Sequence, residues 1–81
     1  MEAWRAEEAL SRTLREIQAE KAAALARIAA TLEDLLAELG RIARTAEASA
    51  PDPRLVSRHQ ELRARALRYR WYLEVQREAV G

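Results

Sequence analysis

Hydrophobic residues recur through residues 3–48 at steps of three and four, which is the spacing of one face of an α-helix. Ala, Leu, Glu and Arg dominate this segment, and no alternating pattern or β-branched run predicts a strand. The first seam, as we call the main apolar row, is Leu10, Leu14, Ile17, Lys21, Leu25, Ile28, Leu32, Leu35, Leu39, Ile42 and Ala46. Its heptad pattern contains one stutter near Lys21, which predicts a local unwinding of a left-handed supercoil.

Both prolines of the chain follow this segment closely and predict a turn over residues 49–52. Asp52 suits the capping of a new helix, and Pro53 suits its first position, so we predict a second helix over about 53–80. Gly81 is either its stop or a point where a longer chain was cut. The second seam is Leu55, His59, Leu62, Ala66, Tyr69, Leu73, Gln76 and Val80. The predicted fold is all-α, a long coiled-coil-like hairpin forming one domain over residues 1–81.

Gly40 is the one residue that weakens the first predicted helix, by about 1 kcal/mol relative to Ala. The apolar spacing continues through Leu39 and Ile42 on either side of it, so we predict an unbroken helix. A break at Gly40 would give three helices instead of two.

Each predicted helix also has a second apolar face. In the first helix this second row is Ala22, Ala29, Leu36 and Ala43. In the second helix, the face opposite the second seam is Ala64, Leu67, Trp71 and Val75. Helices that are apolar over this width contact more than one neighbour, so we expect a second chain or another protein to cover the face around Trp71.

The two predicted helices differ in length, at about 69 Å and about 42 Å for 1.5 Å per residue. Folded back from the turn, the second helix reaches only to about residues 17–27, which leaves the start of the first helix uncovered. We therefore predict a homo-oligomer, with a dimer that forms an antiparallel four-helix bundle favoured. The expected interface residues are Trp4, Leu10, Leu14, Ile17, Leu67, Trp71 and Val75.

Composition supports a need for a partner, because a chain of 81 residues has a thin core of its own. The sequence has no Cys and a single His, so neither disulfides nor a metal cluster stabilise it. We expect no cofactor and no metal site. The absence of Cys favours the cytoplasm, and neither a signal peptide nor a membrane-spanning run is present, so we expect no membrane contact.

The residue types that serve as catalytic groups in enzymes are present, but their spacing in this sequence does not form a catalytic site. His59 has Leu55, Val56, Leu62 and Arg63 as its helical neighbours, none of them a metal ligand. Glu16 and Glu20 share a face, but Arg12 offers Glu16 a surface ion pair. With no Cys and two Gly, no nucleophile motif or phosphate-binding loop exists, so we expect no enzyme.

Four Arg and three aromatic residues lie within residues 63–72, a composition also used to contact phosphates and stack on bases. The four are Arg63, Arg65, Arg68 and Arg70. They spread around the helix, with Arg63 and Arg70 on one flank and the other two on the opposite flank, so no basic stripe forms. We therefore expect a protein interaction module, such as an adaptor or small accessory subunit. A nucleic-acid-binding protein is the alternative.

Charge is divided unequally between the two halves. Residues 1–50 hold seven Lys and Arg against nine Asp and Glu, whereas residues 51–81 hold seven Arg against four acidic residues. Two helices that pack on each other show such opposition, and so does a basic second helix that faces another molecule.

Overall fold

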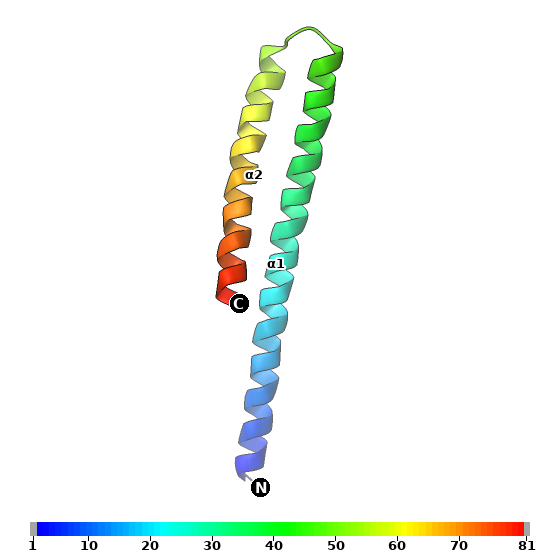
Figure 1. Ribbon diagram of the computed structural model, residues 1–81. Coiled ribbons are helices and arrows are strands. Elements are labelled where there is room, and N and C mark those ends of the chain that lie inside the picture. The colour runs from blue at the N-terminus through cyan, green and yellow to red at the C-terminus, as the bar shows by residue number, and fades with distance from the viewer. Residues whose placement is uncertain (1, 81) are drawn as a thin grey trace.

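The protein is an antiparallel hairpin of two helices, α1 (Glu2–Ala48) and α2 (Pro53–Val80), which lie side by side along the upper part of Figure 1. The computed structural model describes the backbone of residues 2–80 and the side chains of residues 2–79. The predicted stop at Gly81 and the place of the Val80 side chain in the second seam lie outside these described residues. The predicted all-α hairpin is thus confirmed.

Helix α1 runs through Gly40 without a break, as the apolar spacing predicts. Gly40 keeps a negative φ, so the backbone there needs no glycine. A Cβ atom added at Gly40 would meet only the Nη1 atom of Arg44 at 3.3 Å, the far end of a flexible side chain. Continuity of α1 therefore depends on its neighbouring residues and not on any special geometry at position 40.

Asp52 starts α2 in the predicted way. Its Oδ1 accepts a hydrogen bond of 2.9 Å from the backbone N–H of Arg54, and its carbonyl oxygen accepts one of 3.2 Å from Val56. The first of these bonds satisfies an amide that has no partner within the helix, and Pro53, which lacks an N–H, occupies the first helical position. At the other side of the turn, the Ser49 hydroxyl donates to the Thr45 carbonyl oxygen at 2.6 Å.

The core of the hairpin is small and lies where the two predicted seams meet. Its buried members are Leu35, Ile42, Leu62 and Ala66, and Leu62 is the most enclosed at 2% exposure. Partly buried residues pack against them: Leu32, Leu39, Leu55 and Tyr69. Every residue of α2 through residue 79 that is not fully exposed belongs to the second seam. The seams predicted from spacing are therefore the contact faces of the hairpin.

The N-terminal arm, by which we mean residues 2–20 of α1, extends beyond the end of α2 (Figure 1). Helix α1 has 47 residues against 28 in α2, a difference of 19. Gln76 of α2 lies in a shallow hollow with Ile17 and Lys21, so the second helix reaches the part of α1 that its length predicts. The molecule is a rod of 74 × 16 × 16 Å with a radius of gyration of 20.5 Å, whereas a compact chain of this length has about 12 Å.

Candidate interaction surface

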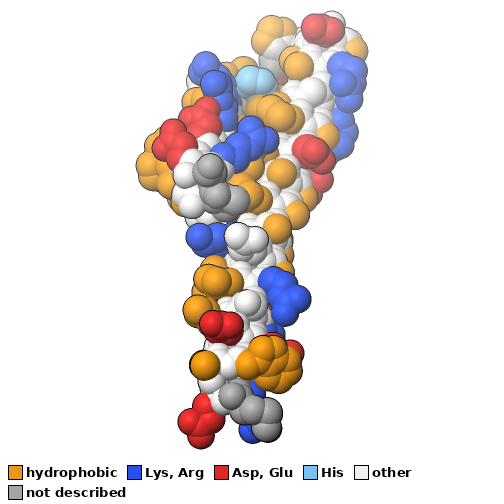
Figure 2. Space-filling view, turned by 60° about the horizontal axis from the view of Figure 1, so that its bottom comes forward, with side chains coloured by type: hydrophobic (Ala, Val, Ile, Leu, Met, Phe, Trp, Pro, Cys, Tyr) orange, Lys and Arg blue, Asp and Glu red, His pale blue; other side chains and the backbone are white. Residues whose placement is uncertain are grey.

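The N-terminal arm presents a row of exposed apolar side chains to solvent. Leu10, Leu14 and Ile17, here called the arm stripe, are 60%, 54% and 42% exposed, and Trp4 is 65% exposed. The arm stripe extends the same seam that α2 covers farther along α1, between Leu25 and Ile42. Figure 2 shows hydrophobic side chains standing apart along this single-helix part of the molecule. The four predicted interface residues of α1 are therefore exposed within one chain, although Ile17, the least exposed of them, borders Gln76 of α2.

Charged residues of the arm are sorted by face. At about 100° per residue, Glu7 lies on one side of the arm stripe and Glu20 on the other, with Glu2 aligned with Glu20. The three Arg of the arm, namely Arg5, Arg12 and Arg15, all lie more than about 120° from the centre of the stripe, as do Glu8 and Glu16. The face that carries the stripe is therefore apolar with acidic flanks, although the arm as a whole has a net charge of only −2.

A groove runs along one side of the hairpin, between α1 and α2. It consists of two adjoining hollows that share His59, one toward the turn and one toward the middle of the hairpin. Its exposed apolar walls are Leu36 and Ala43 of α1 with Val56 and Leu67 of α2. We call this feature the hairpin groove. Leu36 and Leu67 are 55% and 51% exposed, so the groove offers apolar surface that the described part of the same chain leaves uncovered.

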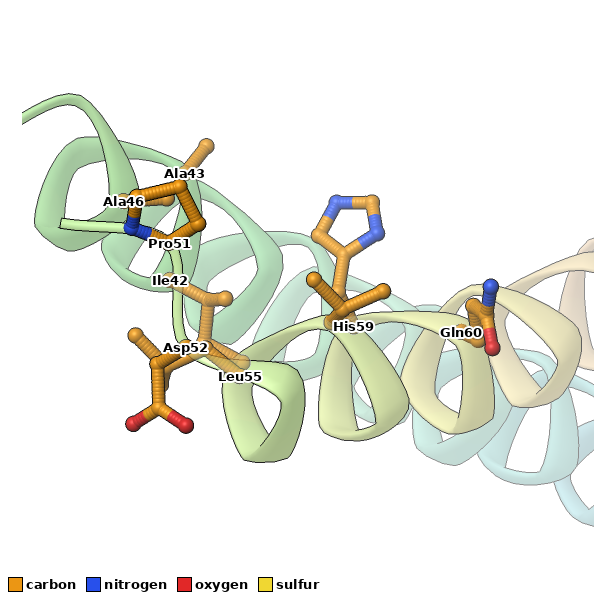
Figure 3. Close-up of a pocket in the computed structure, with 9 residues that line it drawn as sticks. Ile42, Ala43, Ala46, Pro51, Asp52, Leu55, His59 and Gln60 are labelled. Carbon is orange, nitrogen blue, oxygen red and sulfur yellow. The ribbon is translucent and has the colours of Figure 1, made fainter.

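His59 lies in the middle of the hairpin groove and is half-buried. In Figure 3 its side chain points to the same side of the hairpin as Ala43 and Pro51, whereas the carboxylate of Asp52 points the other way. No group of three or more His, Asp or Glu that suits a metal ion lies together in the described part of the chain. His59 is therefore a side chain that lines the groove, with no such group of metal ligands around it among the described residues.

The second apolar face of α2 points away from the hairpin. Trp71 is 58% exposed and Val75 is 39% exposed, and Trp71 packs against Tyr72 with ring centroids 5.6 Å apart. Tyr72 in turn makes an edge-on contact with Tyr69 of the second seam, also at 5.6 Å. Leu67 lies between this face and the hairpin groove, so the predicted α2 interface residues divide between two surfaces.

The basic residues of α2 make no ion pair with α1 in the described part of the chain. The ion pairs found among the described residues all join neighbours on one helix: Arg41 with Glu38, Arg58 with Glu61 at 3.8 Å, and Arg70 with Glu74 at 3.4 Å. Arg63 and Arg70 line the hairpin groove, whereas Arg65 and Arg68 lie on the other flank of α2. Of the two explanations for the unequal charge, the structure gives no support to the one in which the halves attract each other.

The hairpin groove is the surface that sequence reasoning missed. The apolar spacing predicts the second row of α1, with Leu36 and Ala43, but it does not place Val56, Arg63 and Arg70 of α2 beside that row. Periodicity gives the faces of each helix separately. Which flank of α2 meets which flank of α1 depends on the direction in which the turn folds the chain back, and spacing carries no information on that direction.

Comparison with known protein families, with curated proteins and with solved structures finds no match to this chain. Within the described residues, neither helix holds a stretch long and apolar enough to cross a membrane.

Proposed function

We propose that the protein is a non-catalytic interaction module whose hairpins self-associate, with an antiparallel dimer that forms a four-helix bundle as the favoured assembly. The observation that carries this proposal is the uncovered N-terminal arm. Its stripe of Leu10, Leu14 and Ile17 continues a seam that is used for helix packing elsewhere in the same helix. An isolated helix is only marginally stable in water, and a contiguous exposed apolar stripe is typical of a surface that another molecule covers.

The total surface of the chain supports the same proposal. Its accessible area is 6769 Å², whereas a compact monomer of 9.2 kDa has about 4,900 Å². The excess of roughly 1,800 Å² is more than the roughly 800 Å² that each partner contributes to an ordinary stable interface. One chain therefore has surface to spare for a partner without opening its own core.

Light scattering across the micromolar range tests self-association. We expect a mass of about twice the 9.2 kDa of one chain, decreasing toward that of one chain on dilution. A mass of one chain throughout the range contradicts the proposal. The replacement of Leu14 and Ile17 by Asp is expected to dissociate the assembly, because a buried unpaired charge costs several kcal/mol.

Within this proposal the module serves as an adaptor or small accessory subunit in the cytoplasm, and the absence of Cys supports that location. The face around Trp71 is then available for a further protein.

Nucleic-acid binding through Arg63, Arg65, Arg68 and Arg70 is the competing proposal, supported by the exposure of all four side chains. Titration of labelled RNA and duplex DNA at low and physiological salt separates the two proposals. Phosphate contacts release counterions, so affinity that falls steeply with salt, and that Arg65→Glu with Arg68→Glu abolishes in an intact oligomer, favours nucleic acid.

A further inference from the structure

We propose that the occupant of the hairpin groove is the N-terminal arm of a second copy of this chain, and that the two copies exchange arms reciprocally. This inference rests on the proposed self-association and adds where the contact lies. It pairs two sets of exposed apolar side chains in one interface. Leu10, Leu14 and Ile17 of one copy then pack against Leu36 and Leu67 of the other.

Charge complementarity favours the groove over a direct contact between two arms. The flanks of the arm stripe are acidic, through Glu7 and Glu20. The groove is lined on its α2 side by Arg63, which has no ion pair among the described residues, and by Arg70, which also pairs with Glu74 at 3.4 Å. The acidic residue that lines the groove, Asp52, lies at its turn end. Docking the arm into the groove therefore brings opposite charges together beside an apolar centre. Packing two arms through their stripes instead brings four acidic flanks together, because all three Arg of each arm lie on the far side.

Dimensions and symmetry fit the same contact. The arm spans 19 residues, or about 28 Å, and the α2 wall of the groove extends from Leu55 to Arg70, or about 24 Å. In a two-fold dimer whose α1 helices run antiparallel, each arm extends toward the hairpin end of the other copy, so both grooves fill at once. A dimer with parallel α1 helices places arm beside arm and leaves both grooves empty. Near each end of the antiparallel dimer, three helices then pack together.

Paired charge reversals test the contact directly. One variant carries Glu7→Lys and Glu20→Lys, so that its arm is basic. A second variant carries Arg63→Glu and Arg70→Glu, so that its groove is acidic. Each variant alone faces like charges in both contacts, and we expect its self-association to weaken about 100-fold at low salt. Mixed in equal amounts, the two variants have opposite charges in both contacts of the heterodimer. We therefore expect mixing to restore the dimeric mass.

A matched control is Arg65→Glu with Arg68→Glu, which makes the same charge change on the same helix but on the flank away from the groove. This control is expected to dimerise like the original chain. Circular dichroism of each variant reports whether the helices remain folded. Because mixing restores the assembly without any further substitution, general unfolding of a variant does not imitate the expected result.

The outcomes separate this inference from the proposed function. Dimers in all three variants, or equal weakening by the groove and control substitutions, overturn the arm-in-groove contact and leave self-association standing. Failure of the mixture to reach dimeric mass, while the original chain is dimeric, also overturns it. A monomeric original chain overturns both proposals.

Discussion

Leu14 lies at the centre of the arm stripe, and its replacement by Ala gives the sharpest single-residue test of whether the arm is covered. Full burial of a Leu side chain contributes about 1.5–3 kcal/mol, and 54% of Leu14 remains exposed in the single chain. Covering that remainder is therefore worth about 1 kcal/mol in each copy. A symmetric dimer contains Leu14 twice, so the substitution removes about 2 kcal/mol of association free energy, which corresponds to about 30-fold in Kd.

The same change has a different effect on a chain that stays single. Ala is at least as good a helix former as Leu, so Leu14→Ala in an exposed arm alters helical stability by only a few tenths of a kcal/mol. Sedimentation equilibrium over a dilution series measures the Kd directly, and circular dichroism at a fixed concentration checks that the helix is intact.

Arg12→Ala is the matched control, because Arg12 belongs to the same arm and lies on the opposite side of the helix from the stripe. We expect it to leave the Kd within about twofold. The reasoning is refuted if Leu14→Ala and Arg12→Ala give the same Kd as the original chain.

Three further predictions concern the hairpin itself. Leu62→Ala should cost about 2–5 kcal/mol and lower the melting temperature by at least about 10 °C, since Leu62 is the most enclosed side chain of a four-residue core; a smaller shift in a thermal melt would mean that the core contributes little. Gly40→Ala should raise the unfolding free energy by up to about 1 kcal/mol, measured by urea titration, because its φ is helical. Trp71→Ala should leave mass and melting temperature unchanged, because this residue lies outside the hairpin groove; a shift toward the mass of one chain would instead place it in the self-assembly.

Most of the hairpin can be predicted from the spacing of apolar residues along each helix, because that spacing gives the face that each helix buries. Asp52 and Pro53 set the start of α2 through local backbone chemistry, and the steps of three and four fix which residues of each helix meet, with Leu62 at their centre. The unequal helix lengths also fix how far α2 reaches. The hairpin groove needs the spatial relation of two flanks, such as those of Leu36 and Leu67, and a one-dimensional pattern does not contain it.

The short turn next to the buried core also determines how the chain folds. Ile42 and Leu55 flank the turn closely in sequence, so their contact closes a small loop and carries a low entropic cost. Contacts between the helices farther from the turn close larger loops, so we expect them to form later. Such local connectivity is typical of chains that fold in microseconds to milliseconds. In the single chain, amide hydrogen exchange should therefore be slowest beside Ile42 and Leu62 and should quicken steadily toward the start of α1 and the end of α2.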